Sequence, residues 1–585
     1  MPSMELLRSP EGLGSFGELG SKIHAELVRA RVHECNTQPT TLPAPQKQYF
    51  GTMGMRHVLC ICGLPNTCKS FVAFELGWYL EFFHGATVEY FDVAHYAGRG
   101  TKEACARALL EDVQKFLDQA GGRGRQSTST SDVVAVEGMD EESIRMMKMT
   151  DSGRVAIVTP PSLPTMARLK RDDDHAQAKV MWQSIWSCTN ALDRDWVRRE
   201  LQQGKKDSKL MFIEIEVTDE QLLRQHMDAA HKTEQAKLEA LHEWFAYSYT
   251  PLGRAASPES SLSFLKYKNF RDMETHKMHG YLRMRIAQFL SVLRPWRHTI
   301  YLSRHGESTY NVEGRLGGDP GLSPHGESYA RRLGDFTAHC VQLNPRTGTS
   351  VAARLWTSSL IRTIETAKHI PHPVLRARDL EDRADGMDVE DLHGLEWQQM
   401  RLRVYRNLDE LFAGTYDGMR ESEIEALDER FQKDRKLDKL ATRYPHGESY
   451  LDLITRLEPL IHELHSYEEP LVIVSHQATL RVLRAYLMRD RRHPRSMVPK
   501  VEIPQHTIMK ITWDGWHFQP KPALQAAKLS AKEWPPPPGA EWQRPNFSGE
   551  DFGHDPKAAP EPTIGCEEWF WLGPDPKRSD GQQNL

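Results

Sequence analysis

The chain has few cysteines and no long apolar run, and these shortages exclude several classes of protein. Its 585 residues include 8 cysteines, which are scattered and show no spacing typical of metal ligands. Scattered thiols are typical of a reducing compartment and not of a disulfide-stapled secreted domain. No segment has the apolar length that crosses a bilayer, and the N-terminus lacks a basic stretch followed by an apolar one. We therefore expect a cytoplasmic protein with no membrane partner and no metal site.

An excess of charge of one sign is also missing. The chain carries 75 Lys and Arg against 80 Asp and Glu, a formal net charge of −5. This balance gives no reason to expect nucleic acid or an anionic membrane surface as a partner. Any affinity for phosphate must therefore come from local clusters of basic residues.

Internal repeats are absent as well, and composition divides the chain into four segments. Strand-like and helix-like runs alternate through most of it, which favours parallel sheets wrapped by helices. We predict an α/β protein of two domains, each a mostly parallel sheet flanked by helices, with flexible termini. The segments are a partly disordered N-terminal extension at 1–50, a first domain at 51–296, a second domain at 297–519 and a proline-rich tail at 520–585.

Within the first domain the patterns predict individual elements. Strands are expected at 57–62, 155–159 and 209–217, and helices at 69–83 and 275–293.

The second domain and the tail carry two further features. An insertion is expected at about 368–406, with an acid-rich stretch at 379–391. The tail has too little apolar sequence for a core of its own. Its aromatic residues Trp569, Phe570 and Trp571 are expected to dock on the body of the protein or on a partner.

Two histidines stand where predicted strands of the second domain end. Residues 299–304 and 471–475 are short apolar runs rich in β-branched residues, and His305 and His476 follow them. Ligands bind outside the carboxyl ends of strands in open α/β sheets. If the two strands are neighbours, both imidazoles lie in one crevice beside Arg304. Such a crevice suits phosphoryl transfer through a phosphohistidine.

Several ordered blocks carry a resemblance to a known family. The stretch Arg304-His305-Gly306-Glu307-Ser308 resembles the signature of the histidine phosphatase superfamily, which includes the phosphoglycerate mutases. Residues 311–324 resemble, more narrowly, the bisphosphatase half of the bifunctional 6-phosphofructo-2-kinase/fructose-2,6-bisphosphatase family. The matching blocks continue at 356–363, 443–450 and 475–478, and the resemblance covers about 298–515 and, in weaker form, 57–293.

The resemblance implies a fold and partners for both domains. It implies a P-loop NTPase-like first domain and a second domain like histidine phosphatases and phosphoglycerate mutases. It also implies fructose 2,6-bisphosphate and fructose 6-phosphate as substrate and product. Other sugar phosphates remain an alternative because the superfamily scaffold serves many substrates, and a homodimer stays open.

The residue types around the two histidines suit phosphoryl transfer. A neutral imidazole can attack phosphorus, and we assign that role to His305. Arg304 and Arg362 offer planar groups that match phosphate oxygens. His476 can donate a hydrogen bond to the same phosphoryl group. The scheme requires no metal.

The leaving sugar oxygen needs a proton, which calls for a carboxyl group kept protonated by its surroundings. The resemblance places this acid in residues 408–414, where Glu410 is the matching position. Asp409 is adjacent and Glu307 is a competitor for the same role.

A bisphosphate also needs a second anion site. Arg435 and Lys439 are four residues apart and would share one face if that stretch is helical. One tyrosine of the family pattern appears here as Glu421, and a carboxylate at that place would repel a phosphate unless the local alignment slips. The substrate-binding residues that the resemblance implies are Asn311, Gly317, Arg435, Lys439, Tyr450, Gln477 and Arg481.

Residues 63–70 follow a predicted strand and open a helix, which is the context of a phosphate-binding P-loop. The nucleotide-binding candidates are Gly63, Lys69 and Ser70. Cys68 stands where the pattern has glycine, so we expect backbone strain or an obstructed anion site there.

Two more departures weaken the kinase resemblance. The strand at 154–158 ends without the carboxylate that would orient magnesium and the reacting hydroxyl. Residues 91–98 lack the arginine pair that the family uses for its substrate. We therefore predict a fructose-2,6-bisphosphate 2-phosphatase with a degenerate kinase-like half, for which ATP and Mg²⁺ would be cofactors only if that half functions. The alternatives are a bifunctional enzyme that also phosphorylates fructose 6-phosphate with ATP, and a nucleotide-sensing interaction protein with weak or no catalysis.

Overall fold

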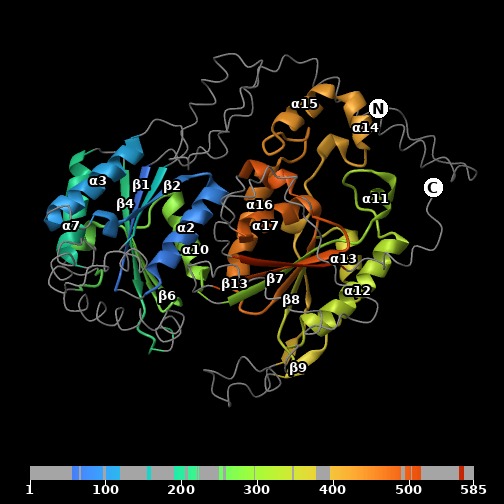
Figure 1. Ribbon diagram of the computed structural model, residues 1–585, viewed down its shortest axis with the longest axis horizontal. Coiled ribbons are helices and arrows are strands. Elements are labelled where there is room, and N and C mark those ends of the chain that lie inside the picture. Colours follow the sequence, from blue (N-terminus) through green and yellow to red (C-terminus); the bar gives the residue numbers. More distant parts are fainter. Residues whose placement is uncertain are drawn as a thin grey trace, which may run out of the picture.

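The computed structural model places two α/β sheets side by side, with helices between them (Figure 1). The predictions for residues 1–50 and for the acid-rich stretch 379–391 lie outside the described residues. The structure describes residues 56–64, 67–96, 101–118, 154–159, 190–204, 208–220, 222, 249–253, 258–295, 297–344, 348–376, 396–488, 495–501, 503–514 and 565–571.

The first sheet belongs to the N-terminal half and has the strand order β2-β3-β1-β4-β5-β6. All neighbouring strands are parallel except β5 and β6. Its central strand has neighbours on both edges and is almost fully buried, which explains its continuous apolar sequence. The strands are β1 (Arg56–Cys62), β2 (Thr87–Asp92), β3 (Arg154–Thr159), β4 (Ser208–Glu216), β5 (Phe264–Lys268) and β6 (Asp272–His276).

Helices cover this sheet and include those that touch the other half. The described helices of the N-terminal half are α2 (Lys69–His84), η2 (Val93–Tyr96), α3 (Lys102–Asp118), α7 (Ala191–Gly204), η3 (Pro258–Ser261) and α10 (Tyr281–Val292). The mostly parallel α/β architecture predicted for this half is confirmed.

The prediction of one long helix at 275–293 is wrong at its start. The chain first forms β6, which pairs with β5 in an antiparallel hairpin. The turn between these strands uses positive φ angles at Asn269 and Phe270. The chain turns again at Lys277, which also has a positive φ angle. The helix begins only after Gly280, which has φ 102°. Cross-strand pairing thus overrides the helical pattern of the first residues.

The second sheet has the order β11-β8-β12-β7-β13-β14, and its core strands are parallel. Strands β13 and β14 extend it in the antiparallel sense, and β9 and β10 form a separate antiparallel pair. The strands are β7 (Arg297–Arg304), β8 (Arg354–Thr357), β9 (Val374–Arg376), β10 (Glu396–Gln398), β11 (Leu402–Val404), β12 (Leu471–Ser475), β13 (Thr507–Asp514) and β14 (Gly565–Trp571).

Helices flank this second sheet on both sides (Figure 1). They are α11 (Thr309–Glu313), α12 (Pro324–Cys340), α13 (Ile361–Ala367), η6 (Arg406–Leu408), η7 (Gly414–Tyr416), α14 (Glu421–Leu427), α15 (Glu429–Leu437), α16 (Tyr450–His465), α17 (Gln477–Met488) and η8 (Arg495–Lys500). No helix among the described residues is both long and apolar enough to span a bilayer.

Strand β14 comes from the segment that composition assigns to the proline-rich tail. Its backbone pairs with β13 over seven residues, from Trp571 opposite Thr507 to Gly565 opposite Trp513. The tail residues 569–571 therefore dock on the body of the protein, which is one of the two outcomes expected for them. Because β14 is antiparallel to β13, its last residue lies at the sheet edge where β7 ends.

The two halves share one continuous apolar core. Helices α2 and α10 of the N-terminal half pack against α16, and α2 also contacts α17. The Tyr79 ring stacks on Phe289 with centroids 4.2 Å apart. The Tyr79 hydroxyl donates to the buried Glu458 carboxylate at 2.5 Å, and Trp78 Nε1 donates to the Tyr486 carbonyl at 2.9 Å. These contacts matter for function because α16 and α17 begin at the candidate site.

Candidate active site

The two histidines lie together at the carboxyl edge of the second sheet. Strands β7 and β12 are parallel neighbours, with Arg304 opposite Ser475. The next residue on each strand end is therefore His305 and His476. The His305 amide donates to the Ser475 carbonyl at 2.9 Å, and the two imidazole centroids are 5.0 Å apart. Both rings can thus contact one phosphoryl group.

The tautomer of His305 follows from its hydrogen bond. Nδ1 lies 2.7 Å from the Gly306 carbonyl oxygen, which can only accept, so Nδ1 carries the proton. Nε2 then holds a lone pair. Burial, followed by the positive charges of Arg362 and Arg304, keeps the pKa of His305 well below its ordinary value. The ring is therefore neutral at physiological pH, which is the state that a nucleophile needs.

His476 is fully buried and offers its other ring nitrogen. Its Nε2 lies 2.7 Å from the Ser358 hydroxyl, which also bonds to Thr363 Oγ1 at 2.9 Å. Nδ1 of His476 is buried and has no hydrogen-bond partner among the described residues. Burial and then Arg362 lower the pKa of His476 well below its usual range. A buried ring nitrogen without a protein partner fits a ligand contact.

Arg362 lies in the first turn of α13 and is almost completely buried. Its guanidinium donates to the Gly318 carbonyl at 2.8 Å, and it makes no ion pair with any residue that the structure describes. Burial lowers the pKa of Arg362, while Glu410 is the first of the acids that oppose this shift. Arg304 closes β7 and reaches the Ile503 carbonyl at 3.4 Å. The two guanidiniums make the crevice positive.

A tight turn holds the loop that contacts Arg362. Gly317 and Gly318 have φ angles of 66° and 60°, and the Gly318 amide donates to Asp417 at 3.0 Å. A Cβ at Gly317 would lie 1.7 Å from the same carboxylate, so glycine is required there. Asn311 accepts from the Ser308 amide in a capping box at α11. Asn311 and Gly317 thus shape this loop.

The three candidate acids have different surroundings. Glu410 accepts from the Ala478 amide at 3.1 Å, so its carboxylate lies at the start of α17 beside the histidine pair. Asp409 accepts from the Ser359 amide and hydroxyl at 2.7 and 2.8 Å, which ties two loops together. Glu307 accepts from the Ser323 hydroxyl at 2.6 Å, where α12 begins. Of the three carboxylates, Glu410 opposes the lowering of the Arg362 pKa most strongly, so it stays the candidate acid.

The predicted second anion residues form a group that we call the distal cluster: Arg435, Lys439, Tyr450 and Arg481. Arg481 donates to the Tyr450 hydroxyl at 2.9 Å. Burial, then Arg481 and Arg435, lowers the pKa of Lys439 to about 8. None of the three cations makes an ion pair within the described residues. Such an uncompensated group suits an anion.

The prediction for Lys439 needs one correction. Helix α15 ends at Leu437, so Arg435 and Lys439 do not share a helical face. The chain turns at Asp438, whose side chain accepts from the Leu440 amide at 3.1 Å, and Lys439 approaches the other cations from this turn. Gln477 begins α17 directly after His476 and so links the reacting crevice to the distal cluster.

The loop before α2, predicted to bind a nucleotide, makes hydrogen bonds within itself. Lys69 Nζ donates to the Leu64 carbonyl of its own loop and to Thr67 Oγ1, the latter at 3.2 Å. Burial lowers the pKa of Lys69 to about 7. Cys68 adopts the left-handed conformation with φ 58° and ψ 25°, so the expected backbone strain at this position is present.

Gly63 opens the loop at a position that only glycine can occupy. Its φ is 127°, and a Cβ would lie 2.3 Å from the Ile215 carbonyl oxygen. Ser70 follows Lys69 in α2.

Sequence reasoning missed two residues of the site. Ser358 orients His476. Its position directly after β8, at the carboxyl end of a parallel strand, is the sequence signal that could have identified it. His506 precedes β13, and its Nε2 lies 3.4 Å from the Glu307 amide. Burial and then His325 lower the pKa of His506 to about 4. No local pattern separates His506 from the other histidines of the chain.

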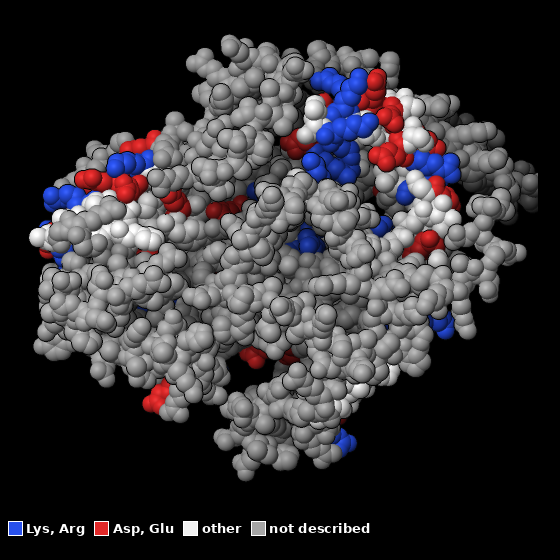
Figure 2. All heavy atoms as spheres, in the orientation of Figure 1, with Lys and Arg blue, Asp and Glu red and all other residues white. Residues whose placement is uncertain are grey.

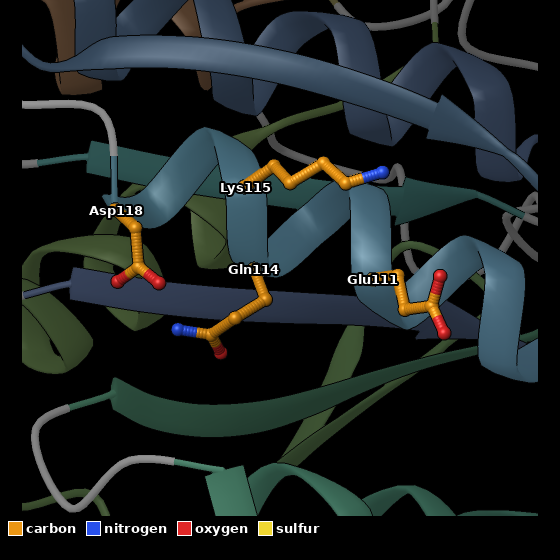
Figure 3. A pocket seen from close by; sticks show the side chains of 4 residues that line it. All are labelled: Glu111, Gln114, Lys115 and Asp118. Atoms are coloured by element: carbon orange, nitrogen blue, oxygen red, sulfur yellow. The ribbon is translucent and has the colours of Figure 1, made fainter.

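A surface hollow on α3 lies far from this chemistry, in the N-terminal half (Figure 3). Its lining residues are Glu111, Gln114, Lys115 and Asp118. Lys115 pairs with Asp112 and Asp118 pairs with Arg56, each at 3.0 Å. These satisfied surface charges indicate no catalytic role.

Comparison with known proteins matches both halves. Residues 300–404 and 394–522 match the model of the histidine phosphatase superfamily (branch 1). A Schizosaccharomyces pombe protein named "Probable fructose-2,6-bisphosphatase" is 35% identical over 52% of this chain and 67% of its own length. A Caenorhabditis elegans 6-phosphofructo-2-kinase/fructose-2,6-bisphosphatase is 34% identical over 55% of this chain and 62% of its own length. A Mus musculus 6-phosphofructo-2-kinase/fructose-2,6-bisphosphatase 1 is 28% identical over 80% of both chains.

Proposed function

The chain belongs to the 6-phosphofructo-2-kinase/fructose-2,6-bisphosphatase family, and we propose that its C-terminal half removes the 2-phosphate of fructose 2,6-bisphosphate through a phosphohistidine. The observation that carries this proposal is the His305–His476 pair, 5.0 Å apart between two arginines. The names of the relatives support the choice of substrate.

The first step transfers the phosphoryl group to His305. Nε2 attacks phosphorus, and the bond from phosphorus to the sugar oxygen breaks. Arg304, Arg362 and the Nδ1 proton of His476 meet the charge on the phosphoryl oxygens. In this scheme the Ser358 hydroxyl, 2.7 Å from Nε2 of His476, acts as the donor in that hydrogen bond, and the ring proton lies on Nδ1. Glu410, in its protonated form, gives its proton to the leaving oxygen, and fructose 6-phosphate departs.

The second step returns the enzyme to its starting state. Water attacks phosphorus, and the Glu410 carboxylate takes the water proton. The phosphorus–nitrogen bond breaks, inorganic phosphate leaves, and Nε2 of His305 regains its lone pair. The distal cluster binds the other phosphate of the substrate and so orients the reacting one.

For the N-terminal half we propose a kinase-like domain without turnover. Magnesium ATP fits poorly there, because Lys69 bonds to its own loop and Cys68 occupies a left-handed position. The carboxylate that the family pattern has at the end of this strand is also missing here, where Thr159 is followed by two prolines. Incubation with fructose 6-phosphate, ATP and Mg²⁺ tests the bifunctional alternative, and formation of the bisphosphate would establish it.

A cytoplasmic location forms part of the proposal. Four described cysteines, Cys60, Cys62, Cys68 and Cys340, are free and buried. Unpaired thiols of this kind persist in a reducing compartment.

Substitution of His305 tests the phosphatase directly. We expect His305→Ala to lower phosphate release from fructose 2,6-bisphosphate by roughly 10³-fold or more, because the nucleophile is gone. An acid-labile phosphoenzyme should form on the wild type and not on the variant. His339→Ala, which changes an exposed histidine of α12, serves as the control and should keep full activity. Unchanged turnover in His305→Ala would refute the proposal.

A further inference from the structure

Helix α14 starts beside the loop that contacts Arg362. The chain just before it pairs with the loop that contacts Arg362, because the Leu316 amide donates to the Met419 carbonyl at 2.9 Å. Arg420 caps the helix and donates to the Glu313 carbonyl at 3.0 Å. The first helical residue is Glu421, so these contacts fix where its side chain begins.

The face of α14 that carries Glu421 is turned toward α15. Glu425 is four residues further along and lies on the same face. It pairs with Lys436 of α15 at 3.3 Å. Figure 2 shows acidic side chains over α14 beside basic ones over α15. Glu421 therefore faces the end of α15 and the chain that follows it.

Electrostatic coupling agrees with this placement. The Glu421 carboxylate opposes the lowering of the pKa of Lys439, which burial, Arg481 and Arg435 cause. It also adds, after burial, to the raised pKa of Tyr444, whose ring lies 4.4 Å below the Arg435 guanidinium. Both neighbours belong to the surroundings of the distal cluster.

We propose that Glu421 sets substrate specificity, by facing the distal cluster with a fixed negative charge that weakens its hold on a phosphate dianion. The site then holds the distal phosphate less tightly than its three cations alone would, and discriminates less between sugars with and without that phosphate. This inference rests on the proposed function and extends it to the choice among substrates. Fructose 6-phosphate keeps the same distal phosphate, so weak binding of this product follows from the same charge.

The test compares two substrates that differ only in the distal phosphate. Glu421→Gln removes the charge and keeps the size of the side chain. We expect kcat/KM for fructose 2,6-bisphosphate to rise about three- to tenfold, the range for one exposed unit charge near a dianion. kcat/KM for fructose 2-phosphate should stay within about twofold of the wild-type value. The Kd of fructose 6-phosphate, measured by calorimetry, should fall by the same factor as kcat/KM rises.

A neighbouring glutamate gives the matched control. Glu425 pairs with Lys436, and Glu425→Gln removes an equal charge from the same helix. This variant should leave kcat/KM for fructose 2,6-bisphosphate and for fructose 2-phosphate unchanged. An unchanged or weakened preference for the bisphosphate in Glu421→Gln overturns the inference. If the wild type cleaves neither substrate, the proposed function fails, and the Kd of fructose 6-phosphate for wild type and Glu421→Gln still decides the role of this residue.

Discussion

Replacing Tyr79 by Phe removes one hydroxyl from the interface between the two halves. That hydroxyl donates to Glu458 at 2.5 Å, and the carboxylate is about 6% exposed. The remaining partners are more distant, with His84 Nε2 at 3.3 Å and Arg285 Nε at 3.8 Å. The phenyl ring keeps its stack on Phe289. The same hydroxyl lies 3.3 Å from His462 Nε2, so the substitution removes a short hydrogen bond to a buried charge and a longer one to a buried imidazole.

The expected cost is about 2 kcal/mol of unfolding free energy, since hydrogen bonds to charged groups contribute about 1.5–3 kcal/mol. Urea unfolding followed by tryptophan fluorescence measures it. We expect one transition in the wild type, because the two halves share a core. Tyr310→Phe is the control, since the Tyr310 hydroxyl has no hydrogen-bond partner among the described residues, and it should cost less than about 0.5 kcal/mol.

The pH dependence of this loss has a defined sign. Burial raises the pKa of Glu458, but hydrogen bonds from His84 and Tyr79 outweigh it, so the folded pKa lies below the usual 4.5. Stability from this group is then present above pH 4.5 and is lost as the pH falls through the folded pKa. Wild type and Tyr79→Phe should converge in that acidic window. A Tyr79→Phe protein as stable as wild type at pH 7 would refute this account of the interface.

Two further predictions concern the reacting histidine and the P-loop. Ring NMR of labelled His305 should show a neutral imidazole at pH 6.5 and down to well below it, because burial and two arginines lower its pKa; a titration near 6.5 would contradict this. Cys68→Gly should change unfolding free energy by less than about 1 kcal/mol, because relief of left-handed strain offsets the loss of a buried thiol and of backbone rigidity. The same variant should still make no bisphosphate from fructose 6-phosphate, ATP and Mg²⁺, and product in that assay would show that Cys68 alone blocks the kinase reaction.

Sequence reasoning succeeded where a local pattern meets a rule of sheet topology. The apolar runs before His305 and His476 identify parallel strands, and parallel strands end at one edge of a sheet. It failed where distant pairing decides the local structure. Residues 272–276 join β5 in a hairpin instead of opening α10. Likewise, nothing local shows that the chain turns after Leu437, although this turn brings Lys439 to the distal cluster.

Helix α2 explains how the N-terminal half supports the candidate site independently of any nucleotide chemistry. Its first residue is Lys69, which bonds to its own loop, whereas its later turns carry Trp78 and Tyr79 into the interface. The helices held there begin at Tyr450 and Gln477, which line the candidate site. These packing contacts do not involve the Lys69 end of α2. A left-handed residue such as Cys68 costs about 1–2 kcal/mol, which is small beside the burial of the α2 aromatic side chains at about 1.5–3 kcal/mol each. The candidate site therefore depends on the folding of the first half.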